Sequence, residues 1–145
     1  MIVRAAEAGD IAVLADIAQR SYRAAFRTIL EEEVLASRDA AFFAARFSAV
    51  WQHMLVVCSA ETPTGFLLMT NGHIDMLFMD PEVSGKGGGA LLLQEAEKRG
   101  AKSLECFRDN QEARRFYERH GWRVAREYER EFAGRSRSFV FYVKD

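Results

Sequence analysis

A glycine-rich run, Ser-Gly-Lys-Gly-Gly-Gly-Ala, occupies residues 84–90 of the chain. It follows an apolar stretch, Ile74–Met79, and the dipeptide Asp80-Pro81, and it leads into the helix-like segment Leu91–Lys98. Glycine reaches positive φ at little cost and lets backbone N–H groups approach a ligand closely. The first turn of a helix adds unpaired N–H groups and the positive end of the helix dipole. The run therefore predicts a strand, a turn that can hold an anion such as a pyrophosphate, and then a helix.

Glycine also gathers in turns for steric reasons, so the run alone is weak support for a ligand. A P-loop requires Ser or Thr after its lysine, and because Gly87 follows Lys86, this interpretation fails. A dinucleotide fingerprint, Gly-x-Gly-x-x-Ala, matches residues 85–90, and Glu105 lies about 20 residues on, where a ribose-binding acid is expected. In that fold the glycines follow the strand directly, whereas residues 80–84 intervene here and Glu105 lies inside a strand-like run. The context therefore disfavours a dinucleotide site.

Apolar periodicity predicts the remaining elements. Strands are expected at residues 1–6, 55–60, 66–70, 73–79, 102–107, 124–132 and 138–143, and helices after residue 10, over 43–51, from about 86 to 99, and over 109–120. Asn71-Gly72 is a two-residue hairpin signal, and residues 133–137 are expected to join the last two strands. The order predicts an α+β fold in one domain, residues 1–145, with a central mixed sheet of about seven strands flanked on both faces by about four helices.

Polar residues mark where these helices are expected to begin. Asp10 is predicted to cap the first helix, and Ser37 or Asp39 the second. Asp109, with Glu112 three residues later, resembles a capping arrangement for the last helix.

Composition limits the classes of partner. The chain has 145 residues, 49% of them hydrophobic, which suits one globular domain with a real core. A net charge of −1 with interspersed Arg and Glu gives no basic face for nucleic acid, and no apolar run is long enough to span a membrane. The first residues lack a signal-peptide core, which predicts a cytoplasmic protein. Cys58 and Cys106 lie in apolar runs, so free buried thiols are expected rather than a disulfide or a metal site.

Two blocks in the second half resemble the GNAT superfamily of N-acetyltransferases. In that family a strand, a Pro-containing turn and Gln/Arg-Gly-x-Gly-x-Gly/Ala precede a long helix, and Met76–Leu92 is similar to this signature. The later motif of the family, a strand followed by Asn, a Phe-Tyr helix and Gly-Phe, is matched by Leu104–Asn110, Phe116-Tyr117 and Gly121-Trp122. Two motifs in the right order are far more specific than one. The departures are Ser84, where Gln or Arg is usual, and Trp122, where Phe is common.

The resemblance implies a GNAT-like fold with acetyl-CoA as co-substrate and no metal. In the family, the strand before the glycines and the strand after the long helix splay apart and leave backbone groups free for pantetheine. The residues that the resemblance assigns to CoA are Leu77, Phe78 and Met79 for pantetheine, by main-chain contacts; Ser84, Gly85, Lys86, Gly87, Gly88, Gly89 and Ala90 for the diphosphate; and Asn110 and Tyr117 for the arm and its thioester. Because Ser84 lacks a long side chain, its effect on CoA affinity is left open.

Acetyl transfer to an amine needs a neutral nitrogen, stabilisation of an oxyanion and a proton for the departing thiolate. Tyr117 is the candidate acid, since a phenol can donate to a thiolate and be reprotonated from water. Asn110, seven residues earlier, is expected on the same helix face. By family analogy, the N–H group of Met79 is the oxyanion donor. The alternative is that Phe116 and Tyr117 merely anchor their helix, with Asn110 acting as an N-terminal residue.

The general base is open among Asp75, His73, Glu105 and water. Asp75 is the first choice because strand alternation places it with His73, Leu77 and Met79 on one face just before the cofactor arm. His73 follows the hairpin turn, where solvent exposure is an alternative, and Glu105 has basic neighbours with which to pair.

Residues 22–51 are expected to cover the acceptor side of the groove, and the sequence does not identify the amine, which belongs to a small molecule or a protein. Glu31-Glu32-Glu33 could attract a cationic amine, although such a run is more often a solvated helix start. Besides an N-acetyltransferase, a non-catalytic CoA-binding sensor or assembly module and, less favoured, a nicotinamide-dependent oxidoreductase remain as alternatives. A homodimer is compatible with the sequence.

Overall fold

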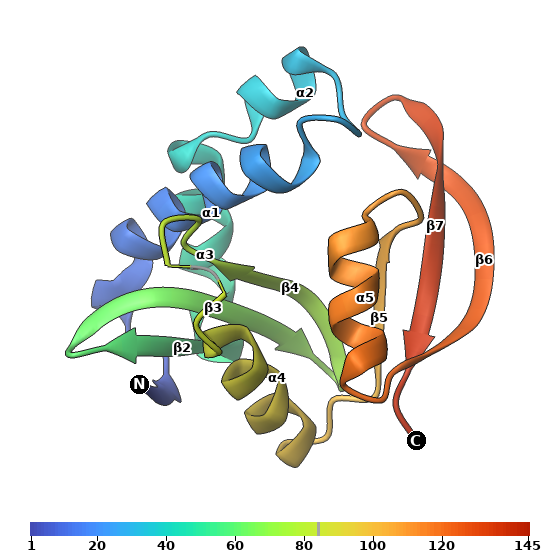
Figure 1. The fold of residues 1–145 in the computed structure, drawn as a ribbon. Coiled ribbons are helices and arrows are strands. Elements are labelled where there is room, and N and C mark those ends of the chain that lie inside the picture. Colours follow the sequence, from blue (N-terminus) through green and yellow to red (C-terminus); the bar gives the residue numbers. More distant parts are fainter. Residues whose placement is uncertain (84) are drawn as a thin grey trace.

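The computed structural model describes residues 1–83 and 85–145; Ser84, predicted to contact the diphosphate, lies outside the described residues. One seven-stranded sheet runs in the order β1-β2-β3-β4-β5-β7-β6 (Figure 1). The strands are β1 (Ile2–Ala5), β2 (Met54–Ser59), β3 (Thr62–Thr70), β4 (His73–Met79), β5 (Ser103–Phe107), β6 (Arg123–Phe132) and β7 (Arg135–Val143). The helices are α1 (Ile11–Phe26), α2 (Glu32–Ser37), α3 (Ala40–Val50), α4 (Gly88–Lys98) and α5 (Gln111–Arg119). The predicted α+β fold with a mixed sheet is confirmed. The described residues form five α-helices rather than about four, and the difference is the six-residue α2, which was not predicted.

Neighbouring strands pair antiparallel except β4 and β5, which are parallel and meet at their first residues only. His73 pairs with Ser103 and Ile74 with Leu104, and beyond these pairs the two strands separate (Figure 1). The sheet is therefore held together at one end of this pair and open at the other. The splay implied by the GNAT resemblance is present, and it leaves one edge of β4 without a ladder of hydrogen bonds.

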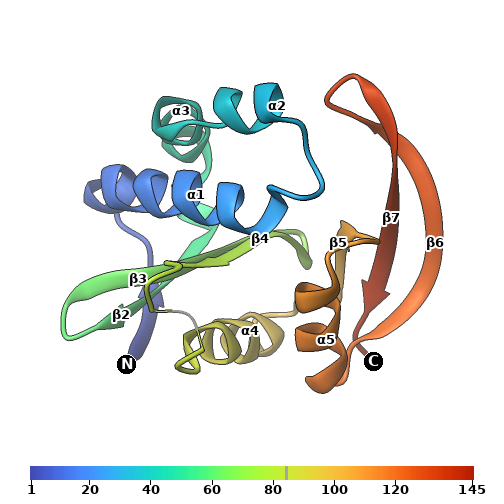
Figure 2. The ribbon, with the colours of Figure 1, turned by 45° about the horizontal axis from the view of Figure 1, so that its top comes forward.

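Helices cover both faces of the sheet, as predicted (Figure 2). On one face α1 and α3 pack on β2–β4 through rings such as Phe47 and Phe66, whose centroids lie 5.3 Å apart. On the other face Leu92 and Leu93 of α4 pack against Leu67, all three fully buried. The strands β2, β3 and β4 thus send alternate side chains into the two apolar clusters, which explains their nearly continuous apolar sequences.

Three cap predictions had different outcomes. Asp39 is confirmed, because its carboxylate accepts a hydrogen bond from the Phe42 N–H group at 2.9 Å. The Asp10 prediction was wrong: its carboxylate accepts instead from the Glu7 N–H group and from Arg4. The last helix is capped not by Asp109 but by its neighbour, Asn110, as described below. A residue that has a competing partner close in sequence is not free to cap a helix.

Three two-residue hairpin turns have positive φ at both central positions, the geometry that matches strand twist. Asn71-Gly72, with φ of 52° and 79°, was predicted. Ala60-Glu61, with φ of 55° and 82°, was not, because it lacks glycine, and β3 consequently begins at Thr62 rather than at residue 66. Ala133-Gly134 forms the third turn, so β7 begins at Arg135, three residues earlier than predicted.

Candidate active site

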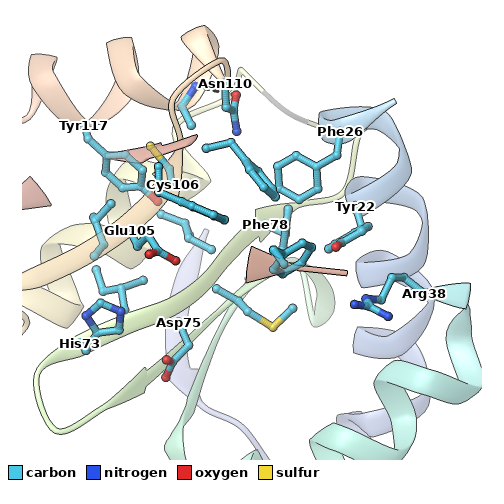
Figure 3. Close-up of a pocket in the computed structure, with 18 of the residues that line it drawn as sticks. Tyr22, Phe26, Arg38, His73, Asp75, Phe78, Glu105, Cys106, Asn110 and Tyr117 are labelled. Atoms are coloured by element: carbon cyan, nitrogen blue, oxygen red, sulfur yellow. Dashed lines mark hydrogen bonds between the residues drawn. The ribbon is translucent and has the colours of Figure 1, made fainter. Parts of the chain in front are cut away.

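A cavity of about 370 Å³ lies where β4 and β5 separate (Figure 3). Its lining includes members of both apolar clusters, such as Phe78 and Phe107 of the α1–α3 face and Leu77 and Tyr117 of the α4–α5 face. The cavity therefore reaches through the gap in the sheet. Two molecules can approach each other there from opposite faces.

The backbone of β4 presents polar groups to this gap. The N–H group of Asp80 points toward β3, since it donates to the Thr64 carbonyl at 2.7 Å. N–H groups of successive strand residues point to opposite edges, so the N–H group of Met79 points into the gap, and that of Leu77 likewise. The side chains of Leu77, Phe78 and Met79 pack in the two clusters. These three residues can therefore offer a ligand main-chain contacts rather than side-chain contacts.

The glycine-rich segment turns into α4 in the manner expected of an anion site. Gly85 and Gly87 have φ of 86° and 90°, in the left-handed region that glycine occupies without a steric penalty. The helix begins at Gly88, slightly later than the predicted residue 86, and its first internal bond runs from the Leu91 N–H group to the Gly87 carbonyl at 3.2 Å. Helix geometry leaves the N–H groups of Gly88, Gly89 and Ala90 without intrahelical partners. Lys86 is exposed beside them.

Asn110 lies at the N-terminus of α5 and lines the cavity. Its Oδ1 accepts a hydrogen bond from the Ala113 N–H group at 3.3 Å and caps the helix. The Nδ2 group has no hydrogen-bond partner in residues 1–83 and 85–145, so it remains available to a ligand. Asn110 thus precedes α5 rather than lying on it, but the predicted convergence with Tyr117 on one cavity is correct.

Tyr117 lies in the same cavity and is buried against aromatic neighbours (Figure 3). Trp122 packs edge-on to it with ring centroids 6.3 Å apart, and Tyr142 lies at 6.1 Å. Burial, with a smaller contribution from the nearby Cys106, raises the pKa of the Tyr117 hydroxyl above its ordinary value. Burial also raises the pKa of the Cys106 thiol to about 12. At neutral pH the tyrosine is therefore a protonated donor, and the cysteine is not a thiolate nucleophile.

Asp75 occupies an irregular position in β4. Leu68 pairs with Met76 and Met69 with Ile74, so Asp75 has no partner in β3. Such a bulge resets the alternation of side chains. Ile74, Leu77 and Met79 consequently pack in the α4–α5 cluster, and the predicted common face of Asp75, Leu77 and Met79 is wrong. Because Ile74 faces α4 and α5, the exposed side chain that follows it, Asp75, points toward the α1–α3 side of the cavity.

The other two candidates for the base are engaged. The Glu105 carboxylate accepts hydrogen bonds from both ends of the Arg130 guanidinium, at 2.5 and 2.9 Å, and from the Tyr128 hydroxyl. Burial raises its pKa, but the bonds from Arg130 and Tyr128 outweigh burial and leave the pKa lowered. His73 is bonded through Nδ1 to the Ser103 hydroxyl at 2.8 Å. Asp75 makes no ion pair with any of the described residues.

The α1–α3 side of the cavity carries the residues expected to face an acceptor. The region predicted for this role, residues 22–51, contributes Tyr22, Phe26, Arg38, Phe42, Phe43 and Arg46. Glu105 of β5 was already a candidate, but three further lining residues from β6 and β7 were missed: Arg130, Phe132 and Phe139. They come from strands that only the sheet order brings to this gap, and no local pattern in the sequence marks them.

The acidic run before α2 is not a free patch for a cation. Glu31 pairs with Arg135 and Arg137, each at 2.9 Å, and Glu32 pairs with Arg23 at 2.8 Å. Glu32 and Glu33 lie in the first turn of α2, where acidic side chains favour the helix dipole. The interpretation of residues 31–33 as a helix start, rather than as a patch that attracts a cationic amine, is therefore correct.

The two cysteines are free, with Cys58 buried and Cys106 half-buried, as predicted. In the described ranges 1–83 and 85–145, no three His, Cys, Asp or Glu side chains are grouped so as to hold a metal ion. No helix within these ranges is both long and apolar enough to cross a bilayer.

The family model of the GNAT acetyltransferase domain matches residues 14–138. The chain therefore belongs to the GNAT superfamily of acetyltransferases. This result agrees with the splayed strands, the glycine-rich turn and the Asn110–Tyr117 helix described above.

Individual relatives agree with the family. Peptidyl-lysine N-acetyltransferase YjaB from Salmonella typhimurium is 34% identical over 71 residues, which are 48% of this chain and 49% of that protein. The chain thus spans about half the length of the curated relatives that it matches. A solved GCN5-related N-acetyltransferase from Rhodopseudomonas palustris has a TM-score of 0.78 at 28% identity, covering 99% of this chain and 94% of its own. PaiA N-acetyltransferase from Thermoplasma acidophilum, solved with coenzyme A, has a TM-score of 0.78 at 20% identity, covering 99% and 98%.

Proposed function

We propose that this chain, as one catalytic domain over residues 1–145, transfers an acetyl group from acetyl-CoA to a primary amine by direct attack in a ternary complex. The observation that carries the proposal is the gap between β4 and β5, where Leu77 and Phe78 of β4 and the Tyr117 side chain line one cavity with residues from both faces of the sheet. Membership of the GNAT superfamily supports the same reaction.

The α4–α5 side of the gap fits coenzyme A. The first N–H groups of α4, at Gly88, Gly89 and Ala90, and the exposed turn at Gly85–Gly87 offer donors and room for a diphosphate. Apart from its chain neighbours, no described residue has an atom within 4 Å of where a Cβ on Gly85 would stand, so the turn is open there. The free edge of β4 and the Asn110 Nδ2 group would hold the pantetheine arm. Lys86 adds positive charge beside the phosphates.

Acetyl-CoA supplies an activated carbonyl, and the chain's residues position the reactants and handle charge. As the C–N bond forms and the C–S bond breaks, negative charge develops first on the carbonyl oxygen, where the Met79 N–H group would donate a hydrogen bond. Tyr117 would give its proton to the departing thiolate, since its raised pKa keeps it protonated at neutral pH. Alignment of the two reactants in one cavity supplies a large share of the rate enhancement.

Asp75 is the favoured base in this proposal. Two carboxylates line the cavity. Asp75 makes no ion pair within the described part of the chain, whereas Glu105 is neutralised by Arg130. Its bulged position directs it toward the side from which the amine would enter. It would accept the ammonium proton directly or through one water molecule.

Calorimetric titration of the purified chain with acetyl-CoA, beside NAD and ATP, tests this assignment. We expect binding of acetyl-CoA alone among the three, and release of free CoA thiol when a suitable amine is added. Binding without thiol release over a broad amine panel would instead support a CoA-binding sensor. A chain that binds NAD but not acetyl-CoA would contradict both.

The name of the YjaB relatives, peptidyl-lysine N-acetyltransferases, supports an acceptor amine carried by a protein. A small-molecule amine would use the same reaction.

A further inference from the structure

The α1–α3 side of the cavity holds positive charge that the protein does not neutralise. The Arg38 guanidinium lies against the rings of Phe42 and Phe132, at 4.6 and 5.8 Å from their centroids. Its side chain donates one hydrogen bond, to the Ser37 hydroxyl at 3.3 Å, and makes no ion pair with any residue that the structure describes. Arg46, exposed on α3, also lines the cavity and is likewise without an ion pair in residues 1–83 and 85–145.

Two other arginines on this side of the molecule are paired with glutamate carboxylates. Arg130 is paired with Glu105 at 2.5 Å, and Arg137, whose side chain is 8% exposed, is paired with Glu31. After these pairs are set aside, Arg38 and Arg46 remain positive, and Asp75 remains negative. The cavity is therefore polarised, with cationic groups on the helical wall and a single unpaired carboxylate on β4.

Tyr22 adds a buried hydroxyl beside Arg38. The residue is 7% exposed, and its ring packs against Phe26 and Phe43 at centroid distances of 4.7 and 5.6 Å. Its oxygen is buried and, in the part of the chain that the structure describes, has no hydrogen-bond partner. Burial raises the pKa of this phenol, and the charge and close approach of the Arg38 guanidinium oppose that shift without reversing it, so the hydroxyl stays protonated as a donor. Leaving such a group unpaired is unfavourable, and a ligand oxygen would relieve the cost.

Tyr22 and Arg38 lie on the wall across the cavity from Tyr117 (Figure 3). A planar guanidinium and a hydroxyl donor together suit a carboxylate, which accepts several hydrogen bonds at once. An amine with nothing but an alkyl chain would leave the Tyr22 hydroxyl and the Arg38 charge without an anionic partner and would bring its own positive charge toward Arg38 and Arg46.

We propose that the acceptor carries a carboxylate close to its amine, and that Arg38 and Tyr22 bind the carboxylate while the amine faces Asp75. The inference rests on the proposed acetyl transfer and specifies the substrate class for it. Arg46 acts at longer range, by attracting the anion toward the cavity. Arg38 and Tyr22 are in this scheme specificity-determining residues and take no part in proton transfer.

Two sources can present this chemistry: a free amino acid, and a lysine beside an acidic residue in a peptide. The test therefore measures thiol release from acetyl-CoA with two matched series. The first pairs free amino acids with their carboxamides. The second pairs lysine peptides that differ in whether the neighbouring residue is Glu or Gln. We expect the carboxylate member to have the lower KM in at least one series, by roughly tenfold or more, and the series that discriminates identifies the source.

Variants locate the effect. Tyr22→Phe removes an oxygen that has no hydrogen-bond partner among residues 1–83 and 85–145, so folding is expected to be unimpaired while KM for the carboxylated acceptor rises. Arg38→Met is expected to raise the same KM roughly tenfold or more and to abolish discrimination against the neutral partner. Arg27→Met is the matched control, because Arg27 is exposed at the end of α1 and does not line the cavity. Calorimetry should show unchanged acetyl-CoA affinity in all three.

Equal turnover of carboxylated and neutral amines, or discrimination that survives in Arg38→Met, would overturn this inference and leave the proposed acetyl transfer standing. The inference is also overturned if the acetyl-CoA complex neither acetylates nor binds any carboxylated amine. Failure to bind acetyl-CoA, by contrast, would overturn the proposed function itself.

Discussion

The Glu31 carboxylate binds the Arg137 guanidinium through two parallel hydrogen bonds, each of 2.9 Å, across 106 residues of sequence. Glu31 immediately precedes α2, and Arg137 lies on β7 beside the β6–β7 turn, so the pair ties the helical wall of the cavity to the hairpin opposite (Figure 1). The hydrogen bonds from Arg137, with help from Arg135, lower the pKa of Glu31 to about 2. The pair therefore stays ionised at neutral pH and links the two walls of the cavity.

Glu31→Gln should loosen the acceptor wall. We expect KM for the amine to rise by a small factor, roughly threefold, because a partly exposed ion pair contributes modestly. Affinity for acetyl-CoA should not change, since the CoA side of the gap lies on the other face. Steady-state kinetics and calorimetry measure the two quantities. Glu33→Gln is the control, because Glu33 is exposed in the same helix and makes no ion pair within the described residues. A weaker acetyl-CoA affinity in Glu31→Gln would show that the two faces are coupled.

Tyr117→Phe should lower kcat by roughly 10²-fold or more, the usual contribution of a general acid, with little change in acetyl-CoA affinity. The phenyl ring keeps the aromatic packing, so the fold should be retained. Tyr142→Phe provides the comparison: its hydroxyl donates to Glu118 at 2.5 Å and does not line the cavity. That variant should lose about 1–2 kcal/mol of stability and keep its activity. Full activity in Tyr117→Phe would assign the tyrosine to packing alone.

Gly87→Ala should weaken acetyl-CoA binding. Alanine at a φ of 90° is strained, at a cost of about 1 kcal/mol or more, and relief of this strain would move the N–H groups at the start of α4. Gly134→Ala is a close match, because Gly134 has φ of 86° with no atom near its Cβ position but lies in the β6–β7 turn. Both variants should lose similar stability in urea unfolding, and only Gly87→Ala should lose affinity by calorimetry. Equal affinities would count against the anion site.

Local signals were enough to predict the framework of the site. The strand–glycine–helix order around residues 74–98 follows from apolar periodicity and from the turn chemistry of glycine, which act over a few residues. The convergence of Asn110 and Tyr117 follows from their spacing, two helical turns apart. The cap was assigned one residue too early because Asp109 and Asn110 are both good cap residues, and in the structure the Asp109 carboxylate is instead paired with Arg108.

Properties that depend on a partner strand could not be predicted. The orientation of Asp75 follows from a bulge in the pairing of β4 with β3, and strict alternation within β4 gives the wrong face. Arg130 and Phe132 lie on the edge strand β6, which follows β5 in the sheet only after β7, so their place in the cavity lining depends on the assembled sheet. The unpaired state of Arg38 depends on which carboxylates other arginines have already taken, which is a property of the whole fold.

Glu105→Gln should separate a structural role of this residue from a catalytic one. Since Arg130 and Tyr128 already occupy its carboxylate, we expect acetyl transfer to persist. The free energy of unfolding should fall by about 1 kcal/mol. This value is modest because the Arg130 side chain is 43% exposed and solvent screens the pair. The pKa of Glu105 is lowered in the folded state, so the carboxylate contributes its full stabilisation above the ordinary value of 4.5.

Below that pH the unfolded chain takes up a proton first, and the contribution is lost as the pH falls toward the lowered folded value. The difference in unfolding free energy between the two proteins should therefore be constant near neutral pH and shrink on acidification, as measured by urea unfolding at several pH values. A difference that grows toward acid would contradict the lowered pKa. Complete loss of acetyl transfer at neutral pH, with the fold intact, would make Glu105 rather than Asp75 the base.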